Sequence, residues 1–219
     1  MKKSSKNRLM PHQESLFPGS TLFDKIARAV CRAGTLPRKE LHETWEMAKR
    51  VRRRYRGGRV IDIACGHGLL AHIMLILDNS SKIALAVDPS LPKNAFKISS
   101  ELISVWPRLK ERVIYKNTQA QDITIQPDDI VVSAHACGAL TDLIIDKAVE
   151  QHARIAVLPC CHNLKESSTI GLEGWMENTL AVDTVRAIRL QSKGYKIVTQ
   201  NIPCDITPKN RLLMGEYKQ

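Results

Sequence analysis

From residue 60 onward, short apolar runs alternate with stretches of helical periodicity. Seven runs read as strands, at 60–64, 82–87, 112–115, 130–133, 154–158, 195–202 and 211–217. The spacing between them predicts helices over 69–77, 93–105, 140–151 and 175–190. The last two strands are joined by a loop too short for a helix, so they must be antiparallel. This pattern predicts an α/β fold, with a Rossmann-like, seven-stranded, mostly parallel sheet, an antiparallel last strand and helices on both faces.

The first 57 residues follow a different pattern. Residues 1–20 are polar and basic and include the turn residues Pro18-Gly19-Ser20, so we expect a mobile leader there. Residues 21–57 are expected to form a helical extension, with one helix ending before Gly34 and a second running from Pro37 to about Arg56. The catalytic domain is then expected over 58–219.

Positive charge is concentrated in the same part of the chain. The protein has 33 Lys and Arg against 22 Asp and Glu, a net charge of +11. Residues 1–59 hold 16 basic and 5 acidic residues, whereas residues 60–219 hold 17 of each. Such asymmetry is typical of a segment that meets a polyanion, and we expect RNA binding through basic residues 2–56. A solubilising, solvated helix face is the alternative.

Other classes are disfavoured by composition. No run reaches the roughly 18 apolar residues of a membrane span, and no apolar signal segment follows the basic N-terminus. Six cysteines without the spacing of a disulfide framework indicate a reducing, cytoplasmic setting. The sequence leaves the oligomeric state open.

The stretch from 60 to 70, V-I-D-I-A-C-G-H-G-L-L, reads as a strand, a tight turn and the start of a helix. Such a unit directs backbone N–H groups toward a nucleotide at the carboxyl end of the strand. The turn also fits the dinucleotide pattern G-x-G-x-x-G/A, with Asp88 about 20 residues on. A carboxylate at Asp62 favours instead a ligand with an α-amino group and a sulfonium.

The same turn resembles the first motif of class I S-adenosylmethionine (SAM) methyltransferases, (D/E)-x-(G/A)-x-G-x-G. Asp62, Ala64, Gly66 and Gly68 match it position by position, with Ala64 where Gly is usual. The resemblance implies SAM as the cofactor. Further cofactor contacts are expected after the next three strands. These are Asp88 with Pro89 at the ribose hydroxyls, Asp122 with Gln121 at the adenine, and Ser133 at the end of the fourth strand.

Histidines and cysteines follow the fourth and fifth strands, in Ser133-Ala134-His135-Ala136-Cys137-Gly138 and Pro159-Cys160-Cys161-His162. These strands should be neighbours, so the two loops should meet. A zinc site, a Cys160 thiolate that attacks a pyrimidine, a pocket with a histidine base, and buried structural cysteines are all open. We favour the pocket, assign no metal, and take His135, His162 and Cys160 as candidate catalytic residues.

These loops, H-A-C-G-A-L-T-D (135–142) and L-P-C-C-H (158–162), resemble a methyltransferase subfamily marked by H-x-C-G-x-x-T-D and P-C-C-(H/Y). That subfamily includes eukaryotic tRNA 2′-O-methyltransferases and methyltransferase-like proteins. The zinc-finger-like modules of the tRNA enzymes have no counterpart in residues 1–58, which hold one cysteine, Cys31. The resemblance implies in-line methyl transfer from SAM to a nucleophile, probably on tRNA or rRNA. A protein or small-molecule methyltransferase and a non-catalytic RNA-binding relative are the alternatives.

Overall fold

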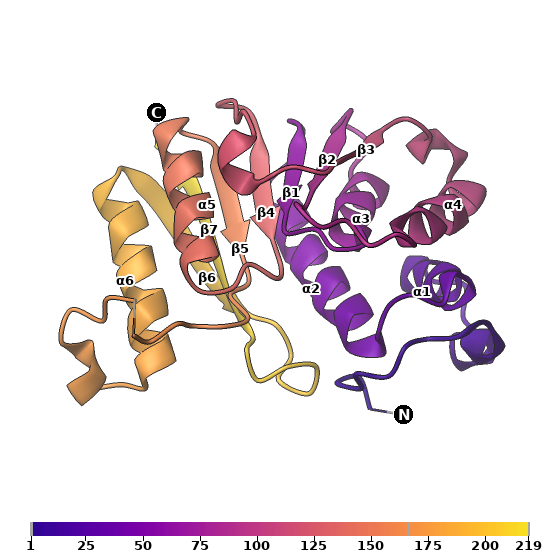
Figure 1. The fold of residues 1–219 in the computed structure, drawn as a ribbon, viewed down its shortest axis with the longest axis horizontal. Helices are drawn as coiled ribbons and strands as arrows, with labels where there is room; N and C mark the ends of the chain where they lie inside the picture. The colour runs from indigo at the N-terminus through magenta and orange to yellow at the C-terminus, as the bar shows by residue number, and fades with distance from the viewer. Residues whose placement is uncertain (1, 166, 219) are drawn as a thin grey trace.

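The computed structural model describes residues 2–165 and 167–218, built around one mixed sheet (Figure 1). Its strand order is β3-β2-β1-β4-β5-β7-β6. The strands are β1 (Val60–Ile63), β2 (Ala84–Val87), β3 (Val113–Lys116), β4 (Ile130–Ser133), β5 (Arg154–Val157), β6 (Tyr195–Asn201) and β7 (Arg211–Tyr217). Strands β1 to β5 are parallel, and β7 is antiparallel to both of its neighbours. The predicted sheet and its antiparallel last strand are confirmed.

Helices cover both faces of the sheet. They are α1 (Leu22–Ala33), α2 (Arg38–Arg54), α3 (Leu69–Leu77), α4 (Ala95–Val105), α5 (Ala139–Glu150) and α6 (Asn178–Ser192). Short 3-10 turns lie at Pro11–Leu16 (η1), Pro107–Leu109 (η2), Ala120–Asp122 (η3) and Leu172–Gly174 (η4). Successive strand residues point to opposite faces, so Val60 packs with the core under α1 to α4 and Ile61 with the core under α5 and α6. The expectation of helices on both faces is confirmed.

The N-terminal segment differs from the mobile leader predicted for residues 1–20, of which residue 1 lies outside the described residues. Leu9 and Phe17 are buried in the core. The Leu9 N–H donates to the Leu36 carbonyl (2.9 Å), and the Arg38 N–H donates to the Asn7 carbonyl (3.1 Å). Two isolated apolar residues give no periodic signal in a polar stretch, but each fills a site that α1 and α2 leave open.

Helix α2 runs from one edge of the sheet to the other. Near its end, Arg52 is buried, donates to the Met74 carbonyl (3.0 Å) and pairs with Asp78 (3.2 Å). Burial lowers the pKa of Arg52 to about 10, so the guanidinium stays charged at neutral pH. Since Asp78 lies between α3 and β2, the end of α2 is fixed where the parallel strands begin. Its first turn therefore lies at the carboxyl edge, which we define as the edge where β1 to β5 end.

Among the helices of the described residues, none combines the length and the apolar character that crossing a membrane requires.

Candidate active site

Asp62 lies near the end of β1 with its side chain 1% exposed. The Ala71 N–H, in the first turn of α3, donates to its Oδ2 (3.1 Å). Burial raises the pKa of Asp62 to about 8, and the carboxylates of Asp88 and Glu40 act in the same direction. No basic side chain in the described ranges forms an ion pair with Asp62, although a buried carboxylate normally has such a partner. The site therefore suits a ligand that brings its own positive charge.

The turn after β1 contains three left-handed residues, Ala64 (φ 58°), Gly66 (φ 51°) and Gly68 (φ 74°). A Cβ on Gly66 would meet no atom within 4 Å, so the space beside this glycine is open. A Cβ on Gly68 would come within 2.9 Å of the Tyr115 ring, whose hydroxyl donates to the His67 carbonyl (2.9 Å). Gly66 therefore leaves room for a ligand, whereas Gly68 lets the turn pack on β3.

Asp88 lies directly beside this turn, at the end of β2. The Gly66 N–H donates to its Oδ2 (3.1 Å), and the Ser90 N–H donates to its Oδ1 (2.9 Å). Each carboxylate oxygen keeps a further lone pair for a ligand hydroxyl. The open space at Gly66 and the two carboxylates at its rim fit a cationic nucleoside such as SAM, which Asp62, Gly66 and Asp88 would hold. Contact of Asp88 and Pro89 with the ribose stays a prediction.

The other expected cofactor residues lie at separate positions. Gln121 and Asp122 form the exposed turn η3, and Lys147 of α5 donates to the Gln121 carbonyl (2.7 Å). Ser133 is fully buried, and its Oγ accepts from the Ala136 N–H (3.2 Å). In this arrangement the Ser133 hydroxyl stabilises the loop after β4. Contacts of these three residues with the cofactor stay predictions.

The loops after β4 and β5 lie against each other, as their strand order requires. Cys137 and Cys161 form an isolated parallel bridge, and the Gly138 N–H donates to the Cys161 carbonyl (3.0 Å). The Sγ atoms of Cys137, Cys160 and Cys161 lie within 4.8 Å of one another, and we call these three residues the sulfur cluster. Burial raises the pKa of Cys160, so its side chain is a neutral thiol and a weak nucleophile in this state. Its catalytic role stays a prediction.

The two histidines of these loops point in different directions. His162 is 2% exposed, and its Nε2 lies 2.7 Å from Oδ1 of Asp183 on α6. His135 is near Lys39 and Glu43 in the first turns of α2, and burial lowers its pKa, so its ring is neutral at pH 7. His135 Nε2 and His162 Nδ1 are buried without a partner among the described residues. Each ring therefore keeps one nitrogen for a proton or a substrate group.

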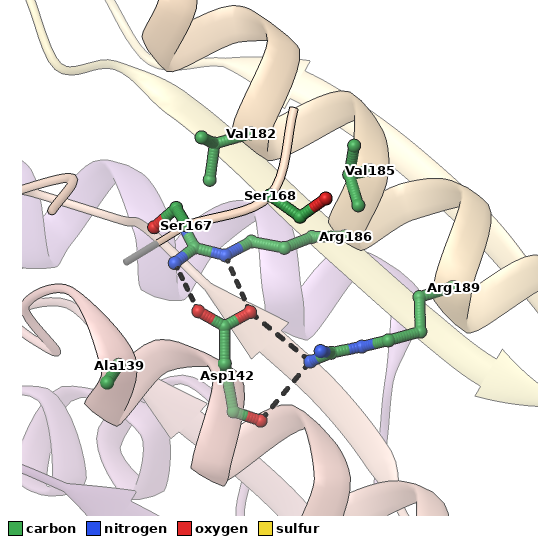
Figure 2. Close-up of a pocket in the computed structure, with 8 residues that line it drawn as sticks. All are labelled: Ala139, Asp142, Ser167, Ser168, Val182, Val185, Arg186 and Arg189. Atoms are coloured by element: carbon green, nitrogen blue, oxygen red, sulfur yellow. Dashed lines mark hydrogen bonds and ion pairs between the residues drawn. The ribbon is translucent and has the colours of Figure 1, made fainter. Parts of the chain in front are cut away.

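Helix α6 fixes both loops through residues that sequence reasoning missed. Arg186 is 1% exposed and donates to both oxygens of Asp142 (3.1 and 2.7 Å), where Arg189 also converges (Figure 2). Arg186 further donates to the Gly138 carbonyl (3.2 Å) and pairs with Asp183 (3.2 Å). Arg186 thus connects the loop after β4 to the carboxylate that orients His162.

Asp183 is itself a shared acceptor. Arg211 of β7 donates to its Oδ2 (2.7 Å) while His162 occupies Oδ1. Burial alone would raise the pKa of Asp183, but the hydrogen bonds from His162 and Arg211 outweigh burial, so the pKa is lowered. The carboxylate is therefore ionised. The spacing of Asp183 and Arg186 by three residues on one face of a helix was the available sequence signal.

Comparison with known proteins identifies the family. Residues 39–167, more than half of the chain, match the family described as a methyltransferase domain. A "Glutathione S-transferase C-terminal domain-containing protein homolog" from Drosophila melanogaster is 25% identical over 202 residues, 74% of this chain and 33% of that protein. A protein of the same type from Xenopus laevis is 32% identical over 62 residues, 28% of this chain and 8% of that protein. The chain thus spans about a third of the length of the Drosophila relative.

Solved structures show the same fold. An O-methyltransferase family protein from Burkholderia thailandensis superposes with a TM-score of 0.55 at 18% identity, over 94% of this chain and 63% of that one. An rRNA methylase from Streptococcus thermophilus superposes with a TM-score of 0.53 at 16% identity, over 82% of this chain and 96% of that one. With the family match and the site at Asp62, Gly66 and Asp88, these findings show that the chain belongs to the methyltransferase-domain family and is a class I methyltransferase with SAM as its cofactor.

Proposed function

We propose that the protein methylates RNA, a tRNA or an rRNA, at the carboxyl edge of the sheet. When bound, SAM supplies a methyl group on a sulfonium, which is already a good leaving group. The chain must then hold the acceptor in line and receive its proton. The motifs at 135–142 and 158–162 support the RNA-modifying subfamily that they resemble. The observation that carries the proposal is the position of the exposed basic residues.

Exposed basic side chains before β1 form two groups. The leader group is Lys2, Lys3, Lys6 and Arg8. Lys3 pairs with Asp205 of the β6–β7 loop (2.8 Å), and Figure 1 shows the N-terminal segment and this loop at the same end of the molecule. Burial and the nearby charge of Arg8 lower the pKa of His67 in the cofactor turn. The leader group therefore lies beside the site.

The second group lies elsewhere. Arg53, Arg54 and Arg56 are exposed at the end of α2, which we call the α2-end group. Arg56 donates to the Leu77 carbonyl (3.3 Å), and Arg154, at the start of β5, donates to the Arg56 carbonyl (2.8 Å). This group therefore lies at the amino edge, across the sheet from the site.

Several basic residues between the two groups are already paired. Lys39 pairs with Glu43 (2.9 Å), and Glu46 pairs with both Lys49 (2.6 Å) and Arg50. An RNA phosphate would have to compete with these carboxylates. The RNA contact expected over residues 2–56 is therefore concentrated in the leader group, with Lys209 of the β6–β7 loop on the same rim.

His135 and His162 are the proposed proton acceptors. Asp183 fixes the ring of His162 and accepts from Nε2, which leaves Nδ1 as the basic nitrogen. His135 is neutral and has a free Nε2. His135→Ala and His162→Ala should each be assayed for methyl transfer beside S-adenosylhomocysteine (SAH) binding. Loss of transfer with binding retained is expected for the variant that removes the acceptor of the proton.

The RNA proposal is tested by two double variants of equal charge change. Lys6→Ala with Arg8→Ala removes two leader charges, and Arg53→Ala with Arg54→Ala removes two α2-end charges. RNA affinity is measured over a range of salt concentration, and methyl transfer from labelled SAM to total RNA is measured in parallel. Each lost phosphate contact lowers the salt slope by about 1, so the leader variant should lose about 2 and the control none.

Two outcomes would overturn the RNA proposal. One is an equal loss of RNA affinity in both double variants, which would mean that only net charge matters. The other is label found in protein or in small molecules instead of RNA, which would favour the alternative substrates.

A further inference from the structure

We propose that the sulfur cluster, Cys137, Cys160 and Cys161, is a zinc site with three thiolate ligands and an open fourth position at the carboxyl edge. This site is separate from the cofactor turn, and the proposal does not depend on RNA being the substrate. Sequence analysis assigned no metal, because four ligands including the two histidines could not be shown to converge. In the structure the sulfurs converge without the histidines.

The backbone of the two loops brings the sulfurs together. The bridge between Cys137 and Cys161 and the Gly138-to-Cys161 hydrogen bond (3.0 Å) fix the loops side by side. The Sγ atoms of Cys137 and Cys160 are 3.0 Å apart, and all three sulfurs lie within 4.8 Å of one another. A tetrahedral zinc with Zn–S bonds of about 2.3 Å separates its sulfurs by about 3.8 Å. Shifts of under about 1 Å would create that geometry.

The cluster differs from ordinary structural cysteines. Free cysteines are usually buried small apolar residues, as Cys31 and Cys65 are in this protein. Cys137 and Cys161 are exposed, and Cys160 is half-buried. Three thiols gathered at a solvent-facing edge gain little from packing, but they form a soft-metal ligand set that an ion can reach from solvent.

The charge around the cluster suits a zinc tris-thiolate. Three thiolates and a zinc ion carry one net negative charge. The Lys209 ammonium lies 3.9 Å from the Cys161 Sγ and would balance that charge. Lys209 belongs to the β6–β7 loop, so an occupied site would connect three loops at the carboxyl edge.

The fourth position is left to water or to a substrate atom. Among the described residues, no fourth carboxylate, histidine or cysteine atom belongs to the group within 4.8 Å. His162 is directed to Asp183 instead, through its Nε2. Three protein ligands with one open position are typical of zinc sites that bind a reacting group, whereas structural sites have four protein ligands.

Metal analysis of the full chain, purified without chelator and with excess zinc removed by dialysis, tests the proposal. We expect one zinc ion per chain, the same with and without SAH. Cys137→Ser, Cys160→Ser and Cys161→Ser should each lose the metal. Cys204→Ser, which changes an exposed cysteine outside the cluster, is the matched control and should retain it.

A second measurement needs no variant and so does not depend on how the variants fold. Metal-free wild-type protein is titrated with Co²⁺ and should develop thiolate-to-cobalt charge-transfer absorption that zinc abolishes. The proposal is overturned if wild-type protein takes up neither metal, or if all three serine variants retain zinc. It is also overturned if mass spectrometry finds a Cys137–Cys160 disulfide in the purified protein with no metal bound. SAH binding measured on the same samples separates a failed zinc site from a failed methyltransferase assignment.

Discussion

The affinity for SAH should rise with pH because of Asp62. Burial raises the pKa of this carboxyl group to about 8, so the free protein holds it mostly protonated at neutral pH. A ligand with an ammonium group favours the ionised carboxylate, so binding must release the proton. The cost of that release falls as pH rises toward 8, and the affinity increases in the same direction.

The magnitude follows from the pKa. For a group that must ionise on binding, the apparent dissociation constant is multiplied by 1 + 10^(pKa − pH). With a pKa of about 8 this factor is about 100 at pH 6 and about 4 at pH 7.5, an increase in affinity of about 25-fold or ~1.9 kcal/mol. Burial also raises the pKa of Glu40 to about 7, and this carboxyl group acts in the same direction.

Calorimetric titration with SAH between pH 6 and 7.5, in two buffers of different ionisation enthalpy, measures both the affinity and the protons released. Release of about one proton near pH 6 is expected. Asp62→Asn should weaken binding and abolish most of the pH dependence, while Glu40→Gln separates the smaller contribution. An affinity that is flat or falls as pH rises, or binding without proton release, would refute the assignment of Asp62 as the partner of the ligand cation.

Four further outcomes are expected. Asp88→Ala should weaken SAH binding about 10- to 100-fold by calorimetry, since it removes hydrogen bonds to a charged acceptor, and unchanged affinity would contradict the assignment. Ala64→Gly should raise the free energy of unfolding by up to about 1 kcal/mol in urea, because Ala64 has φ 58°, and a loss would contradict it. Arg186→Met should cost about 3–5 kcal/mol by leaving buried carboxylates unpaired, whereas Arg189→Ala, at a residue 36% exposed, should cost under about 1 kcal/mol; equal effects would refute this. The raised pKa of Asp62 stabilises the folded apo protein below about pH 4, and this stabilisation is lost as pH rises to about 8, so the melting temperature of apo protein should fall over that range.

Elements with a strong local signal could be predicted closely. The helix predicted over 69–77 and the strands over 130–133 and 211–217 have the observed bounds. Each combines an apolar run with a glycine, proline or charged boundary. The helix predicted from about 175 begins instead at Asn178, because Glu177 caps it by accepting from the Thr179 and Leu180 N–H groups. Capping by a glutamate is a weak sequence signal.

The cofactor turn was predictable because its chemistry lies in consecutive residues. The separate tasks of Gly66 and Gly68 were not, because they depend on Tyr115, which comes from β3. The clamp of Asp183 and Arg186 on the two acceptor loops likewise depends on how α6 packs. The division of the basic residues between two edges was available from the sequence. A short link at Gly57-Gly58 requires the end of the preceding helix to lie where the first strand begins.

The buried Arg52 has a consequence for how the protein unfolds. Its hydrogen bond to the Met74 carbonyl and its ion pair with Asp78 join α2 to α3 with a charge that cannot be exposed cheaply to a partly unfolded core. Helix α2 and the central strands should therefore unfold as one cooperative unit, and the amide hydrogens of Met47 and Val51 should exchange as slowly as those of β1. The residues that precede the first strand are thus part of the folding nucleus of the domain in an energetic sense, and trimming them would unfold the cover of the sheet along with its basic surface.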